Sequence, residues 1–190
     1  AGFLGAQWDA PDGESGVMAN QGAAMDLMGQ WALGAFRNQA GLSDSPDEPL
    51  PFRIGWFPFP EVEGGAGLAT DGFGGADGFV VGADAPAETA DFLSYLVNTE
   101  NQRTFALSGT GIPANLEATA AITEAPAPDG PVMQTVLEAL NAATFHQQFL
   151  DQFYTAEVGA AVNDQTALLF AGETTPEEAA AAITAVAGGS

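Results

Sequence analysis

The sequence contains many more segments with helical spacing than segments that could form β-strands, and this shortage of strands limits its folds. Three short apolar runs have the length of strands and end near a glycine or proline: residues 22–28, 52–60 and 79–82. About six segments instead carry helical periodicity or helix-end signals. Three strands are too few for two complete wound sheets. We therefore expect a helix-rich α/β fold.

The helical signals concentrate in the second half of the chain. Apolar residues recur at helical spacing after Pro86 (Thr89, Phe92, Leu93, Leu96 and Val97) and again in 133–140 and 158–169. Thr99–Gln102 and Thr175–Glu178 have the pattern of a capping box, and Gly172 has that of a C-cap. Short helices are also predicted near 14–20 and 32–36, with a surface loop at 41–51 and a linker at 124–131.

Trp31 follows an apolar run that Gly29 interrupts, at a position where a helix could begin. If the run is a strand, this side chain lies at the carboxyl end of a sheet, where ligands of α/β proteins usually bind. A large aromatic there could be a platform for a flat apolar ligand, or it could be a core residue. Both interpretations stay open from spacing alone.

The glycine-rich stretch from residue 64 to residue 78 lacks the Gly-Lys-Ser/Thr sequence of a phosphate-binding loop, and the whole chain lacks lysine. Two interpretations remain. The stretch could be a flexible hairpin or hinge, or its small residues could let backbone amides approach a ligand closely. On the second interpretation Gly74, Gly75 and Asp77 are candidate ligand contacts.

A patch rich in aromatic and amide side chains runs from Phe145 to Tyr154 and contains His146 and Asp151. Such a mixture suits sugar recognition, because rings stack on C–H surfaces and polar groups bond to hydroxyls. The alternative is that the aromatics form core beneath a loop. His146 has no cysteine or second histidine with which to bind zinc, and no spacing indicates a catalytic triad or a calcium loop. We therefore predict no catalytic residue, metal site or cofactor.

Several of these segments together resemble the extracellular solute-binding proteins of bacterial ABC sugar importers. The most specific match comprises Ala85-Pro86, Ala90, Phe92-Leu93, Tyr95-Leu96, Glu100, Gln102 and Gly111-Ile112-Pro113-Ala114. Matches in the same order are Met18 to Met25 with Gly29-Gln30-Trp31, Gly74 to Phe79, and Asn163-Asp164 with Phe170 to Glu178. The family often has an aromatic-Asp-Gln sequence where Asp151 stands. The match from Met18 to Met25 departs from the family pattern at two positions. The family has an aromatic residue where Met18 stands and a lysine directly after the glycine that corresponds to Gly22.

The resemblance implies the two-lobe fold of type II periplasmic binding proteins, here incomplete. It covers about residues 16–188, and family members are roughly twice as long, so the chain is expected to hold the helix-rich C-terminal portion. By the family's chain path, residues 1–71 belong to the second lobe, 72–118 return to the first lobe, and 119–190 form a helical segment of the second.

The resemblance also implies that the protein binds a mono- or oligosaccharide and delivers it to the permease subunits of an ABC importer. Trp31, Gly74, Gly75, Asp77 and Asp151 are then the candidate ligand-binding residues. An extracellular or periplasmic location follows, with a lipoprotein anchor in the full-length protein and no membrane insertion of this segment. The competing hypotheses are a structural or protein-interaction fragment without a small ligand, and a glycosidase-like enzyme.

The charge of the chain is extreme, since 25 Asp and Glu residues face only three arginines and give a net charge of −22. Such a chain repels nucleic acid, which proteins bind through Lys and Arg. Nucleic-acid binding is therefore excluded from the expected functions.

The same charge predicts a salt-dependent stability. Self-repulsion destabilises the compact state and is screened by ions, so the melting temperature should rise as sodium chloride increases from very dilute to near molar. A thermal melt followed by circular dichroism measures this, and a flat or falling curve would contradict it.

Overall fold

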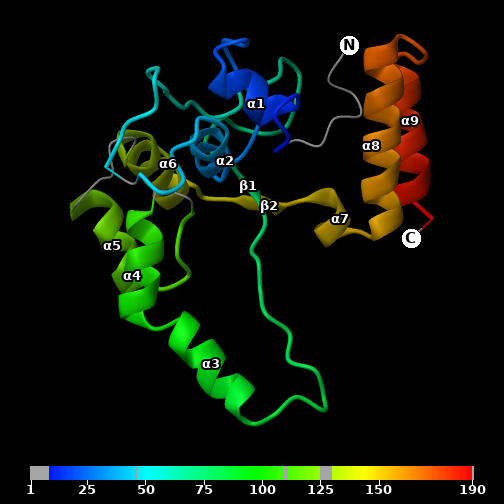
Figure 1. Ribbon diagram of the computed structural model, residues 1–190. Coiled ribbons are helices and arrows are strands. Elements are labelled where there is room, and N and C mark those ends of the chain that lie inside the picture. Colours follow the sequence, from blue (N-terminus) through cyan, green and yellow to red (C-terminus); the bar gives the residue numbers. More distant parts are fainter. Residues whose placement is uncertain (1–8, 46, 109–110, 125–129, 190) are drawn as a thin grey trace. The chain divides into compact units, whose positions relative to one another are not determined.

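The computed structural model describes residues 9–45, 47–108, 111–124 and 130–189, and helices are the main regular structure of these residues (Figure 1). The helices in these ranges are α1 (Glu14–Ala19), α2 (Ala32–Gln39), α3 (Glu88–Leu96), α4 (Thr99–Leu107), α5 (Leu116–Glu124), α6 (Gly130–Ala142), α7 (Leu150–Phe153), α8 (Ala156–Ala171) and α9 (Pro176–Ala187). The strands are β1 (Gly72–Gly74) and β2 (His146–Gln148). This helix-rich content with few strands is compatible with the predicted α/β class.

The described residues divide into two compact units. Unit 1 comprises residues 71–76 and 144–189, and unit 2 comprises residues up to 70 together with 77–143. Unit 1 therefore holds both strands with α7, α8 and α9, and unit 2 holds α1 to α6. The assignment of 1–71, 72–118 and 119–190 to the lobes of a binding protein stays a prediction.

Unit 2 is built around one cluster of buried apolar side chains. Its members come from α2, from the loop after α2 and from α4, α5 and α6: Ala32, Leu33, Phe36, Leu42, Leu50, Ala106, Ala121, Ile122, Met133 and Leu137. Met133 is 1% exposed and is among the largest fully buried side chains of the described residues. Burial of a side chain of this size contributes about 1.5–3 kcal/mol. Packing between helices thus stabilises this unit.

The buried guanidinium of Arg37 holds the loop after α2 against that helix. Its Nη1 donates to the carbonyl of Glu48 at 2.9 Å, and its Nη2 donates to the carbonyl of Ser45 at 2.6 Å. These bonds satisfy backbone groups of a segment that forms no helix or strand. They explain how the predicted loop at 41–51 is ordered enough to bury Leu42 and Leu50.

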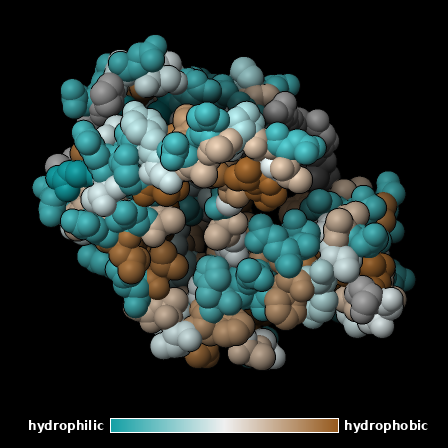
Figure 2. All heavy atoms as spheres, turned by 90° about the horizontal axis from the view of Figure 1, so that it is seen from below, coloured by the Kyte–Doolittle hydropathy of each residue, from teal (hydrophilic) through white to brown (hydrophobic). Residues whose placement is uncertain are grey.

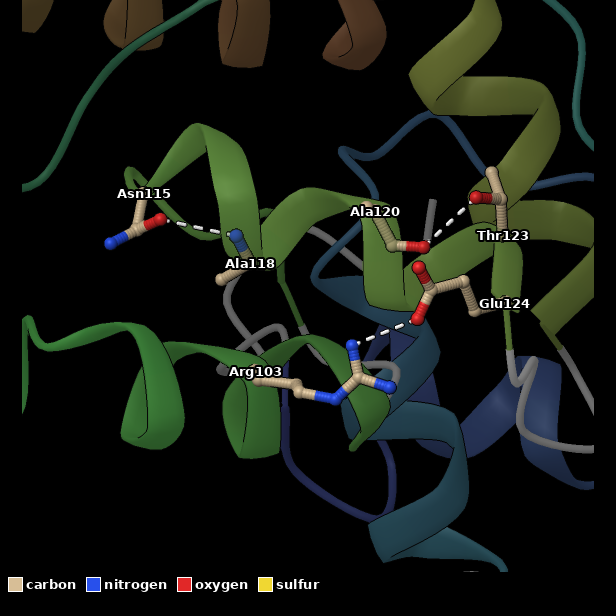
Figure 3. Close-up of polar contacts among 6 residues, drawn as sticks. All are labelled: Arg103, Asn115, Ala118, Ala120, Thr123 and Glu124. Atoms are coloured by element: carbon tan, nitrogen blue, oxygen red, sulfur yellow. Dashed lines mark hydrogen bonds and ion pairs between the residues drawn. The ribbon is translucent and has the colours of Figure 1, made fainter.

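α4 and α5 lie side by side, and Figure 3 shows a cap at the start of α5 and an ion pair between the two helices. The Oδ1 of Asn115 accepts from the backbone N–H of Ala118 at 3.1 Å and so caps α5. Arg103 on α4 pairs with Glu124 on α5 at 2.9 Å, with both side chains largely exposed. An exposed pair of this kind contributes at most about 1 kcal/mol. The buried apolar face of α5 therefore contributes more to the stability of this helix pair than the ion pair does.

Gln102, part of the most specific family match, has a structural role at the corner between α3 and α4. Its Nε2 donates to the carbonyl of Leu96 at 3.2 Å, and its Oε1 accepts from the backbone N–H of Ala114 at 3.1 Å. The side chain thus joins the end of α3 to the segment that follows α4. A glutamine supplies both a donor and an acceptor, which this corner requires.

In unit 1, α8 and α9 form an antiparallel helical hairpin (Figure 1). Gly172 ends α8 in the left-handed conformation at φ 75°, as a C-cap glycine does. Thr175 opens α9 with the predicted capping box, in which its side chain accepts from the N–H of Glu178 and the Glu178 carboxylate accepts from the N–H of Thr175. That bond from the Thr175 N–H, followed by the Thr175 hydroxyl, lowers the pKa of Glu178.

Other helix predictions needed small corrections. α4 is capped by Asn98, whose side chain accepts from the N–H of Asn101, and not by Thr99. α3 begins at Glu88, two residues after the predicted Pro86. α5 was not predicted, although Asn115 before an alanine-rich run is a cap signal. Part of the predicted linker, 125–129, lies outside the described residues.

The three predicted strands were wrong, since residues 22–28, 52–60 and 79–82 form no β-ladder. A strand needs a neighbouring strand to bond its backbone groups, and none of these runs has such a neighbour among the described residues. Val80 is 96% exposed, so apolar composition at 79–82 does not reflect burial. Phe52 and Ile54, by contrast, pack against the core of unit 2 from an extended segment.

In the part of the chain that the structure describes, no helix combines the length and the hydropathy that crossing a membrane requires.

Met133→Ala should lower the free energy of unfolding by about 2–5 kcal/mol, because it leaves a cavity among α2, α5 and α6. Leu116→Ala is the control on a neighbouring helix, where the side chain is 86% exposed and the change should be close to neutral. Urea denaturation of both variants tests this, and equal losses would contradict the assigned core.

Candidate functional site

β1 and β2 pair in parallel in unit 1 and bring together two segments that are far apart in the sequence. The register pairs Gly72 with His146, Phe73 with Gln147 and Gly74 with Gln148. The backbone N–H of Gly72 donates to the carbonyl of Phe145 at 2.8 Å. Because the strands are parallel, their carboxyl ends lie at the same edge, where α/β proteins usually bind ligands.

Gly74 and Gly75 therefore stand beside the residues that follow β2. A Cβ atom at position 75 would lie 2.5 Å from Oε1 of Gln152, so the Gln152 amide occupies the space that a side chain at Gly75 would take. At position 74 a Cβ atom would lie 3.8 Å from Cε1 of His146, an ordinary contact. The requirement for glycine is thus stronger at position 75.

Asp151 lies on α7, one residue before Gln152, and packs against α8. A Cβ atom at position 159 would lie 2.5 Å from Cβ of Asp151, so Gly159 permits the close approach of α7 to α8. The Asp151 side chain is exposed. Three of the five predicted contacts, Gly74, Gly75 and Asp151, are thus placed in one unit, at the end of the ladder and on the helix after it.

Aromatic rings border this region. Phe73 on β1 and Phe149 at the N-cap of α7 meet edge to face, with ring centroids 5.1 Å apart. Phe153 and Tyr154 form a second edge-to-face pair with centroids 4.9 Å apart. Phe73 is largely exposed. Phe153 and Tyr154 are each about half exposed, so the alternative of an aromatic core in the patch from Phe145 to Tyr154 does not describe these two rings.

The electrostatics of unit 1 favour a neutral or cationic ligand. All three arginines of the chain, Arg37, Arg53 and Arg103, belong to unit 2. Unit 1 carries several carboxylates, including Asp151 on α7 and Glu157 in the first turn of α8. The hydrogen bond from its own backbone N–H is the largest cause that lowers the pKa of Glu157. An anionic ligand would be repelled here.

Trp31 is the N-cap residue of α2 in unit 2 and is 38% exposed. Its ring lies directly over Gly29, where a Cβ atom would collide with the indole. The next residues, Ala32 and Leu33, are buried in the cluster, and Trp31 lies at the surface beside it. The predicted strand before Trp31 is absent, but the side chain has the partial exposure expected of a platform.

Asp77 is exposed and belongs to unit 2. Its part in ligand binding stays a prediction.

Across residues 9–45, 47–108, 111–124 and 130–189, no group of three or more His, Asp or Glu residues is placed to hold a metal ion. His146 lies on β2 and is exposed. The hydroxyl hydrogen bonds of Ser43, Ser94 and Ser108 among the described residues go to groups other than His146.

Sequence reasoning missed Gln152 and Phe73 as site residues. Phe73 stands between two glycines in the candidate loop, and Gln152 is the glutamine of the aromatic-Asp-Gln sequence around Asp151. The signal was present in both cases, but only the register of β1 on β2 shows that these residues meet in space.

Comparison of the chain with protein-family models, with curated proteins and with solved structures found no significant match.

Trp31→Ala should lower the free energy of unfolding by about 1–2 kcal/mol, because only part of the indole is removed from water. Chemical denaturation measures this loss. A buried tryptophan would lose about 3–5 kcal/mol, and a loss of that size would show that Trp31 is a core residue.

Proposed function

We propose that this chain binds a carbohydrate as part of an extracellular solute-binding protein of an ABC importer. The observation that carries the proposal is the β1–β2 pairing, which brings Gly74 and Gly75 beside α7 with Asp151 and Gln152. These are the two segments that the family resemblance marks for ligand binding, and 70 or so residues separate them in the chain.

The chemistry of this region supports a neutral hydroxylated ligand. Asp151 and Gln152 offer carboxylate and amide groups that can accept and donate hydrogen bonds to hydroxyls. Phe73, Phe153 and Tyr154 offer ring faces or edges to the C–H surfaces of a pyranose. Unit 1 lacks arginine and lysine, which a phosphate or carboxylate ligand would need. A sugar therefore fits better than an anionic ligand.

The type II two-lobe fold is the architecture that this proposal requires. Trp31, at the surface of unit 2, is the aromatic platform that the resemblance assigns. A half-exposed indole can bury on the order of 100 Å² against a pyranose, worth about 2 kcal/mol before entropy costs.

A protein-interaction role is the second candidate, and exposed apolar residues favour it. Phe79, Val80, Phe92 and Tyr95 are all more than half exposed, and α3 buries no residue. Figure 2 shows apolar residues, in brown, at the surface of the face that it presents. Apolar exposure of this extent is typical of surfaces that another protein or domain covers.

Isothermal titration of a panel of neutral mono- and oligosaccharides into the full-length protein tests the first proposal. Saturable binding without turnover of the sugar supports it. Turnover would instead indicate a glycosidase, and self-association without sugar binding would favour the interaction role.

Gly75→Ala should weaken sugar binding about tenfold, because the new methyl group displaces the Gln152 amide and about 1.4 kcal/mol is lost with its hydrogen bond. The melting temperature should change little, since a flexible side-chain end moves. Gly78→Ala is the matched control, because its Cβ atom would meet open space. Equal affinities of the two variants would remove Gly75 and Gln152 from the site.

A further inference from the structure

The chain reverses direction sharply after α1. The backbone N–H groups of Gln21 and Gly22 donate to the carbonyls of Met18 and Val17 at 2.9 and 2.8 Å. Gln21 has a φ of 58°, a left-handed conformation that costs a non-glycine residue about 1 kcal/mol or more. Residues 23–28 follow this turn and lead to α2.

Residues 23–28 are held weakly. No backbone hydrogen bond joins them to any other residue that the structure describes. Met25 and Leu27 are 74% and 77% exposed, whereas Asp26 between them is half-buried. This alternation is that of an extended segment with one side chain turned inward. The inward side chain is a carboxyl group.

Asp26 is the neighbour whose side chain and charge act on the carboxyl group of Glu14, in the first turn of α1. Glu14 Oε1 and Asp26 Oδ2 are both buried, and neither accepts a hydrogen bond from the described residues. The hydroxyl of the neighbouring Ser15 is also buried and donates to neither. One oxygen of each carboxyl group is thus buried without a donor, although both residues are half-buried. The two groups repel each other when Glu14 is ionised, so the contact is most stable when Glu14 keeps its proton.

We propose that Glu14 and Asp26 form a proton-dependent latch that holds residues 23–28 against α1 when Glu14 is protonated and releases them when Glu14 loses its proton. This inference is independent of the proposed function. Because residue 28 leads through Gly29 to Trp31, release of the latch frees the chain immediately before the N-cap of α2.

The direction of the pH effect follows from the environment of Glu14. Burial, then the hydrogen bond to Asp26 and its charge, raise the pKa of Glu14 from 4.5 to about 7. Between these values the folded chain keeps a proton that the unfolded chain has lost. The stability that the latch contributes is therefore complete below pH 4.5 and is lost as the pH rises through about 7.

Few other charged groups belong to the elements packed here. Asp9 and Asp12 precede α1 and are exposed, and Arg37 on α2 donates to the carbonyls of Ser45 and Glu48. Asp9 accepts through its backbone carbonyl from Gln39. The carboxylates would add to the repulsion of the ionised pair, and the guanidinium is engaged in the loop after α2.

A spin label tests the latch, because the chain has no cysteine and one can be introduced at a chosen site. In Met25→Cys carrying a nitroxide, the mobile fraction should rise from about one tenth to about nine tenths between pH 6 and pH 8, for a single titration near 7. The same label at Val62→Cys, in an exposed loop, is the control and should not respond. A mobile fraction at position 25 that is independent of pH would overturn the proposal.

Glu14→Gln and Asp26→Asn each replace the shared proton by an amide N–H that donates to the remaining carboxylate. In either background the label at position 25 should stay restricted from pH 5.5 to pH 8.5. Glu63→Gln, which removes the same charge at an exposed position, should keep the response of the unsubstituted chain. The pH response of the unsubstituted chain decides the matter if a variant fails to fold, and a persistent response in both folded variants would overturn the latch.

Discussion

The satisfaction of backbone hydrogen bonds within helices is the constraint on which the rest of the structure depends. The described strands are three residues each and pair only with one another, so sheets contribute little to the backbone bonding. Packing in unit 2 is consequently helix on helix around Phe36 and Met133. The extended segments between helices rely on side chains for their order, as the loop that Arg37 binds illustrates.

The helices could be predicted largely from sequence because the signals that start and end them are local. Thr175 and Glu178 satisfy each other's backbone groups within four residues, and Gly172 adopts the left-handed conformation that a helix end requires. The starts of α3 and α4 were predicted to within two residues, and at α4 the neighbouring Asn98 and Thr99 compete for the cap, whereas α5 was missed. Neither case depends on distant parts of the chain.

The strands and the candidate site could not be predicted in the same way, because they depend on partners far along the chain. His146–Gln148 is polar and has no alternating pattern, yet it forms β2 because Gly72–Gly74 lies beside it. The apolar run at 79–82 has a better strand composition and no partner among the described residues. The sequence indicated Asp151 and Gly75 separately as candidate contacts. Only the folded structure shows that Gly75 lies beside Gln152.

The capped hairpin of α8 and α9 has a consequence for the order in which unit 1 assembles. Its contacts are local in sequence, and elements of this kind form within microseconds. The pairing of β1 with β2 must close a loop of about seventy residues, which costs more chain entropy than a helical turn. We therefore expect the hairpin to form first and to offer α7 a surface on which to dock. The edge that carries Gly75 and Gln152 is then expected to form last, at a rate set by the closing of this long loop.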